Sequence, residues 1–164
     1  MKTVYLAGGC FWGMQKFLDQ FPGVLKTEVG YANGPDKAPS YRDVCSNSGH
    51  AETVRVDYDE TVLPLNELLD FYFMVIDPLS VNRQGMDAGL QYRTGVYYTD
   101  ESQLKEIDAA FEKVRAQVGA PLAVEKLPIQ NFFSAEEYHQ KYLDKNPGGY
   151  CHIPTRYFSI AKKE

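Results

Sequence analysis

The chain of 164 residues contains no hydrophobic run that approaches the roughly 20 apolar residues of a membrane-spanning helix. Its first residues, MKTV, lead directly into a strand-like run instead of a secretory signal. The 22 acidic and 17 basic side chains form no blocks of one sign, which disfavours nucleic acid and anionic membranes as partners. We therefore expect a cytoplasmic protein with no nucleic-acid or membrane partner, and we take it to be a monomer.

Cysteine is scarce, and its count is odd. An odd number does not suit a framework of structural disulfides, so the reactivity of the thiols matters more than their packing. No CxxC or similarly tight pair accompanies the histidines His50, His139 and His152, so we expect no metal site. The three thiols are Cys10, Cys45 and Cys151.

Length and an apolar share of 44% suit one compact domain over residues 1–164. Periodicity predicts strands at 3–7, 24–31, 50–59, 92–99 and 122–129, and helices at 12–21, 65–76, 104–118 (capped by Asp100) and 134–142. Segments 33–49 and 77–91 are expected to be long irregular loops, and about 144–164 an irregular tail. The order βαββαβ, with additions, indicates an α+β fold: a ferredoxin-like two-layer sandwich with a mixed central sheet flanked by helices.

The stretch GGCFWG places Cys10 between the first predicted strand and the first helix. Free backbone N–H groups and the dipole of a helix start stabilise negative charge, so we expect a lowered pKa and a nucleophilic thiolate at Cys10. The glycines permit a sharp turn and close access to the sulfur. Phe11 and Trp12 can then form an apolar cage for a methyl or methylene group. The alternative is that all three are ordinary core residues.

Alternation over residues 50–59 places Glu52 on the same face as Val54, Val56 and Tyr58. A carboxyl group on an apolar face is desolvated, which raises its pKa and suits it to act as a general acid near neutral pH. The alternative is a residue near the strand end whose side chain reaches solvent.

The second loop ends in GMDAGLQYR, where Gly85 and Gly89 flank Asp87, and Tyr92 begins the next strand. Glycine-flanked loops often surround sites, but this pattern alone is weak, and by itself Asp87 is more typical of a turn with an Asx hydrogen bond. Tyr41, in the first loop, has no distinguishing pattern of its own, because the chain contains 12 tyrosines.

Five segments together resemble the A-type peptide methionine sulfoxide reductases. They occur in the family's order and span nearly the whole chain: GCFWG (9–13), GHAE (49–52), GMDAGLQYR (85–93), EEYHQKYL (136–143) and KNPGGYC (145–151). The resemblance implies an oxidoreductase that repairs oxidative damage by reducing methionine-S-sulfoxide in peptides and proteins, with the free amino acid as a further candidate substrate.

The resemblance also implies roles for individual residues. Cys10 would be the nucleophile that attacks the sulfoxide sulfur, and Phe11 and Trp12 the walls of the pocket for the substrate's methyl group. Glu52 resembles the acid that protonates the sulfoxide oxygen, which is a poor leaving group until protonated. The other matches are polar residues of the site: Tyr41 and Tyr92, which would hydrogen-bond that oxygen, and Asp87, a further pocket position.

The implied reaction leaves Cys10 as a sulfenic acid, which condenses with a second thiol. Cys151, in its GYC context, matches the family's resolving cysteine, and thioredoxin would reduce the resulting Cys10–Cys151 disulfide, with dithiothreitol as a substitute in vitro. No bound cofactor is expected. Cys45 is either a bystander or an alternative resolving cysteine. The chain departs from the family pattern at three positions that concern the fine tuning of the pocket: Gln15, Met86 and Leu90.

Two other functions remain open from the residues alone. A Cys/His acyl transferase or hydrolase would pair Cys10 with His50 or His139, but it does not explain the carboxyl group on an apolar face or a second cysteine in a glycine-rich tail. A non-catalytic reader would grip oxidised methionine in the aromatic cage without reducing it, and its function would survive Cys10→Ser.

Overall fold

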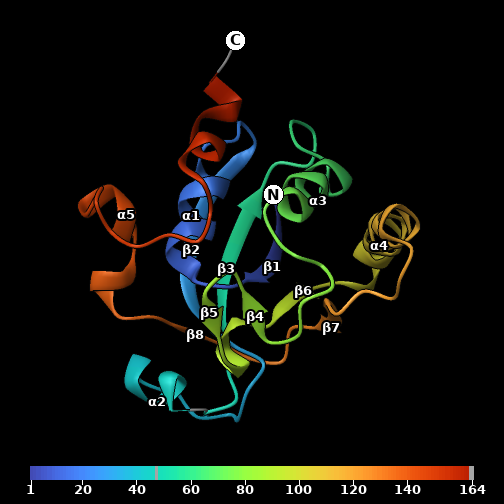
Figure 1. Cartoon of the computed structure of the whole chain (residues 1–164). Coiled ribbons are helices and arrows are strands. Elements are labelled where there is room, and N and C mark those ends of the chain that lie inside the picture. Colours follow the sequence, from blue (N-terminus) through green and yellow to red (C-terminus); the bar gives the residue numbers. More distant parts are fainter. Residues whose placement is uncertain (47, 163–164) are drawn as a thin grey trace.

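A computed structural model describes residues 1–46 and 48–162, so the last two residues of the predicted tail and residue 47 of the first loop lie outside it. Its longer strands and helices follow the predicted order (Figure 1). The strands are β1 (Lys2–Gly8), β2 (Val24–Ala32), β3 (Ala51–Tyr58), β4 (Arg83–Gln84), β5 (Asp87–Ala88), β6 (Thr94–Tyr98), β7 (Glu125–Pro128) and β8 (Phe132–Ser134). The α-helices are α1 (Phe11–Asp19), α2 (Tyr41–Cys45), α3 (Leu65–Met74), α4 (Leu104–Val118) and α5 (Tyr142–Lys145). Short 3-10 helices are η1 (Leu90–Tyr92), η2 (Glu101–Gln103), η3 (Glu137–His139) and η4 (Thr155–Lys162).

Six strands form one sheet in the order β7-β6-β1-β3-β2-β8. Its four central strands are antiparallel and have the order of a ferredoxin-like fold, in which the first strand lies between the third and the last. Strand β7 adds in parallel to β6 and β8 adds antiparallel to β2, so the sheet is mixed. The predicted fold class is confirmed.

The main core lies between one face of the sheet and the helices. Val54, Val56 and Tyr58 of β3 are buried in it together with Met14 and Phe17 of α1, as the alternation predicted. Helix α1 is amphipathic, and α3 contributes buried leucines from the same side. Helix α4 packs outside α3, where the rings of Phe73 and Phe111 meet edge to face, with centroids 5.5 Å apart.

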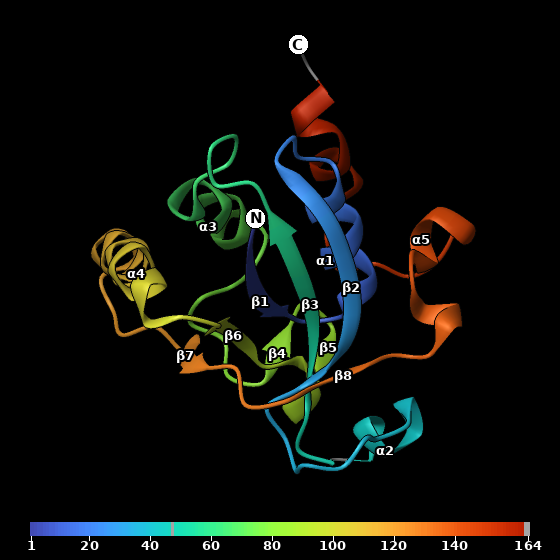
Figure 2. The same ribbon diagram turned by 180° about the vertical axis from the view of Figure 1, so that it is seen from behind.

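On the opposite face, the chain that joins β7 to β8 crosses one end of the sheet (Figure 2). These strands lie on opposite edges of the sheet, yet only residues 129–131 separate them. Six flat strands would span roughly 24 Å, whereas this connection reaches about 14 Å at most. The sheet is therefore curled, and the connection crosses its face, where the rings of Phe132 and Tyr5 lie 5.0 Å apart.

The predicted helix over 134–142 is wrong. The segment forms η3 and then α5, and between them Lys141 takes a left-handed conformation with φ of +55°. Ser134, the first residue of the predicted helix, instead ends β8, where it pairs with Gly30 and its Oγ donates to Glu28 Oε2 (2.7 Å). The carboxylate of Glu136 also binds outside the segment, because it accepts hydrogen bonds from Tyr31 Oη (2.8 Å) and from the Tyr41 N–H (3.0 Å). These tertiary bonds outweigh the local pattern for a helix start.

Other boundaries also differ from the prediction. Helix α2 lies inside the first predicted loop, where Ser40 and Asp43 form a reciprocal capping box. Asp100 caps η2, which leads into α4, and does not cap α4 directly. Tyr92 ends η1 and does not begin a strand. The tail contains η4, so it is not irregular throughout. No helix among residues 1–46 and 48–162 is both long and apolar enough to cross a membrane.

Candidate functional site

Cys10 is the N-cap residue of α1 and is only 6% exposed. The preceding residue, Gly9, has φ of +84°, a conformation that side chains disfavour. A Cβ atom at Gly9 would also lie 2.8 Å from Gln84 Cβ and 3.1 Å from His152 Nε2. Glycine is therefore required at this turn between β1 and Cys10.

Glu52 on β3 lies directly beside this helix start. Its Oε1 accepts a hydrogen bond from the Phe11 N–H (3.2 Å), while Oε2 has no partner among the described residues. The side chain is 1% exposed, and this burial raises the pKa of Glu52 to about 8, against the opposing effect of the Phe11 N–H. The expected burial and raised pKa are both confirmed, and the carboxyl group is largely protonated at neutral pH.

The expectation of a lowered pKa at Cys10 is wrong. Burial raises the pKa of the thiol well above its ordinary value, and the charge of Glu52 raises it further. The helix start acts in the predicted direction, because the Trp12 N–H lowers the pKa of Cys10, but this effect is smaller than desolvation. Before substrate binds, the thiol of Cys10 and the carboxyl group of Glu52 are therefore both neutral at neutral pH.

The two predicted tyrosines and Asp87 lie near enough to Glu52 for charges on these groups to affect one another's pKa values. Burial raises the pKa of Tyr41 and of Tyr92, and the charge of Glu52 is the next cause for both, so their hydroxyl groups remain protonated donors. Asp87, on β5, is half-buried, and burial raises its pKa. Its Oδ2 has no hydrogen-bond partner among the described residues and lies 4.0 Å from His152 Nδ1.

The aromatic pair is held by residues that the sequence analysis did not assign to the site. Phe11 is buried, whereas Trp12 is half-buried and stacks on Tyr142, with ring centroids 3.8 Å apart. Trp12 Nε1 donates to His139 Nδ1 (2.9 Å), which fixes the orientation of the indole. His139 is buried, and Tyr41 packs on its ring at 4.4 Å. In the sequence, His139 and Tyr142 were indicated only by the family resemblance of the segment EEYHQKYL that contains them.

The thiol of Cys151 lies against α1 at Gly13, which is one helical turn after Cys10. A Cβ atom on Gly13 would come within 2.4 Å of Cys151 Sγ, so the glycine provides the space for this thiol. The sulfur accepts a hydrogen bond from the Ile153 N–H (3.2 Å). Cys45, at the end of α2, is exposed and next to Tyr41, whose pKa it raises. All three cysteines are free thiols.

The site does not favour the Cys/His alternative or a metal. Both ring nitrogens of His50 are engaged in the first loop, with Ser48 Oγ and with the carbonyl oxygen of Pro35, each at 2.8 Å. His139 uses Nδ1 to accept the indole N–H. Within the described part of the chain, no three His, Cys, Asp or Glu side chains are grouped to hold a metal ion.

The three departures from the family pattern occupy different surroundings. Gln15 is buried, accepts the Lys141 N–H at Oε1 (2.8 Å) and donates to Thr27 Oγ1 (3.2 Å), so it supports the left-handed residue before α5. Met86 is 83% exposed and Leu90 is also exposed. Gln15 thus acts through the segment that contains Tyr142, whereas the other two line the outer surface.

The family model described as peptide methionine sulfoxide reductase matches residues 2–163. The chain is 54% identical over 162 residues to peptide methionine sulfoxide reductase MsrA of Lachnoclostridium phytofermentans, covering 98% of both proteins. It is similar to the crystal structure of Mxr1 from Saccharomyces cerevisiae in reduced form, with TM-score 0.87 and 40% identity over 94% of this chain and 90% of that one. The structure of Mxr1 in complex with Trx2 matches with TM-score 0.61 and 29% identity, covering 86% and 84%.

Proposed function

The chain belongs to the peptide methionine sulfoxide reductase family, and on this premise we propose that it reduces methionine-S-sulfoxide with Cys10 as nucleophile and Glu52 as general acid. The observation that carries the proposal is the buried carboxyl group beside the N-cap thiol. A protonated acid next to a thiol suits a reaction in which an oxygen atom leaves sulfur, because the oxygen must gain a proton before it can leave.

In the first step, the thiol of Cys10 attacks the sulfoxide sulfur while Glu52 protonates the sulfoxide oxygen. Overall, the oxygen atom moves from the substrate to Cys10: the sulfoxide becomes a thioether, and the thiol becomes a sulfenic acid. The hydroxyl groups of Tyr41 and Tyr92 would donate to the oxygen. Once Glu52 has given its proton to the sulfoxide oxygen, its carboxylate can accept the proton of the Cys10 thiol, so a thiol with a raised pKa can still react near neutral pH.

The substrate's methyl group would lie between Phe11 and Trp12, with Asp87 as a polar contact at the edge. The support for this pocket is the rigid holding of Trp12 by His139 and Tyr142. Rigid aromatic walls favour a methyl group over a larger substituent on the sulfur. We assign the S epimer from family membership and not from this geometry.

In the second step, the thiol of Cys151 attacks the sulfenic acid, forming a disulfide with Cys10 and releasing water. The position of Cys151 over Gly13, one turn from Cys10, supports this assignment. A thioredoxin dithiol would then reduce the disulfide and become oxidised itself. The similarity to the structure of Mxr1 in complex with Trx2 supports a thioredoxin as the partner.

The test is an epimer-resolved assay with racemic peptide methionine sulfoxide and excess dithiothreitol, followed by chromatography. We expect the intact protein to consume only the S epimer, and Cys10→Ser to consume neither. Binding of the sulfoxide without turnover by the intact protein would instead favour a non-catalytic reader.

A further inference from the structure

Tyr92 lies at the end of a short turn that has few hydrogen bonds of its own. Helix η1 has three residues and follows Gly89, whose φ is +145°. Its backbone bonds join the Tyr92 N–H to Gly89 O (3.0 Å) and the Arg93 N–H to Leu90 O (3.3 Å). Because a single 3-10 turn has poor hydrogen-bond geometry, the position of Tyr92 must depend on contacts from other segments.

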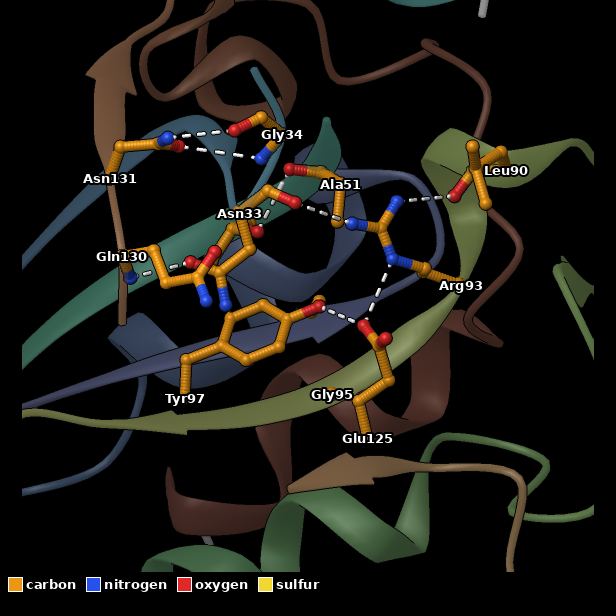
Figure 3. Close-up of polar contacts among 12 residues, drawn as sticks. Asn33, Gly34, Ala51, Leu90, Arg93, Gly95, Tyr97, Glu125, Gln130 and Asn131 are labelled. Atoms are coloured by element: carbon orange, nitrogen blue, oxygen red, sulfur yellow. Dashed lines mark hydrogen bonds and ion pairs between the residues drawn. The ribbon is translucent and has the colours of Figure 1, made fainter. Parts of the chain in front are cut away.

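The guanidinium group of Arg93 provides such contacts (Figure 3). Its Nη1 donates to Leu90 O (3.1 Å), Nη2 to Asn33 O (3.0 Å) and Nε to Glu125 Oε1 (2.9 Å). The Arg93 side chain is only 11% exposed. A planar group with donors in fixed directions holds its three acceptors in one geometry, which a lysine ammonium cannot reproduce.

Asn33 and Gly34 begin the loop that carries Tyr41. Asn33 follows β2 with φ of +51°, and its N–H donates to Asn131 O (3.2 Å). The Asn131 side chain donates to Gly34 O (2.8 Å), as Figure 3 shows. The root of this loop is thus fixed, and Arg93 joins it to η1.

Glu125 fixes the guanidinium from the other side. The same oxygen that accepts from Arg93 also accepts from the buried Tyr97 Oη (2.7 Å). The Arg93 side chain therefore connects β7, the end of β2 and the turn that carries Tyr92.

We propose that Arg93 is a positioning residue of the sulfoxide site, which fixes the Tyr92 hydroxyl relative to Glu52 by joining η1 to the root of the Tyr41 loop. This inference rests on the proposed function, in which Tyr92 donates to the sulfoxide oxygen. Arg93 acts through Tyr92 and does not itself touch the substrate.

The first experiment measures the single-turnover rate of methionine formation in Arg93→Lys. The matched control is Arg55→Lys, which alters an arginine that pairs with Asp57 on β3 away from the site. Small displacements of a reacting group lower rates strongly, so we expect R93K to lose about tenfold or more in this rate, and R55K to lose less than about twofold.

The second experiment separates positioning from general stabilisation of the fold. In a Tyr92→Phe background the hydroxyl group is absent, so R93K should lower the rate by less than about twofold further. An equal loss in both backgrounds, or a rate for R93K equal to that of R55K, overturns the proposal. If R93K does not fold, Glu125→Gln weakens the same contact while keeping an acceptor, and its smaller loss should likewise disappear in Y92F.

A third readout does not require sulfoxide reduction. With 3-fluorotyrosine incorporated, the Y92F variant identifies the Tyr92 resonance in the fluorine NMR spectrum. We expect R93K to shift this resonance and to lower the pKa of Tyr92. Tyr97 should also respond, because it shares Glu125 Oε1 with Arg93, while the tyrosines away from this contact change little. An unchanged Tyr92 resonance overturns the positioning role even if the enzyme is active. Absence of activity in the intact protein contradicts the proposed function alone.

Discussion

Replacing Glu52 by glutamine should make the protein more stable while removing its activity. Burial raises the pKa of Glu52 from 4.5 to about 8 in the folded chain. Between these values the folded protein holds a proton that the unfolded chain has released, so the free energy of unfolding decreases as pH rises. At about 1.4 kcal/mol per pH unit, this decrease amounts to about 5 kcal/mol once the pH exceeds 8.

Glutamine carries no such proton, and its oxygen can still accept the Phe11 N–H. The free energy of unfolding of E52Q minus that of the original protein should therefore be smallest below pH 4.5 and greatest above pH 8. Urea unfolding of both proteins from about pH 4.5 to pH 9, with a reductant present, measures this difference. The single-turnover rate of the original protein should fall as pH rises through about 8, because Glu52 loses its proton. Parallel stability curves at every pH would refute the reasoning, since they would mean that Glu52 ionises freely in the folded protein.

Three further substitutions test other parts of the site. Cys151→Ser should leave the first turnover intact and slow thioredoxin-supported cycling, measured as methionine formed before and after one equivalent. Gly13→Ala should have the same effect, because its Cβ displaces Cys151 Sγ, and a slowed first turnover would contradict this. Trp12→Phe removes the hydrogen bond to His139. It should lower the free energy of unfolding, measured by urea titration, by about 1–2 kcal/mol and raise KM several-fold. Unchanged values of both quantities would show that the bond is unimportant.

The fold was predictable because its strands carry clear patterns. In residues 50–59, period-two alternation correctly placed Val54 and Val56 on the helix-covered face and Glu52 with them. The same reasoning correctly predicted a raised pKa for this carboxyl group, because desolvation follows from the face on which it lies. Short elements were less predictable: α2 was missed although Ser40 and Asp43 have capping-box spacing.

Effects that depend on distant segments could not be predicted. The N–H of Trp12 lowers the pKa of Cys10 as a helix start should, but the burial that outweighs it is produced by the whole fold. The hydrogen bond between Trp12 and His139 joins residues 127 positions apart, and no local pattern indicates it. The predicted helix at 134–142 failed for the same reason, because Ser134, in β8, pairs with Gly30, and Glu136 binds Tyr31 and the loop instead of its own segment.

The crossing between β7 and β8 has a consequence for how the sheet opens. Edge strands usually fray independently, since each is held by one neighbour. Here the two edges are consecutive in the chain and are separated by residues 129–131 only, so detaching one pulls directly on the other. Native-state hydrogen exchange should therefore show the amides of β7 and β8 opening together, with similar free energies, although four strands lie between them. The curled sheet would then behave as a closed ring and not as a ribbon with two free ends.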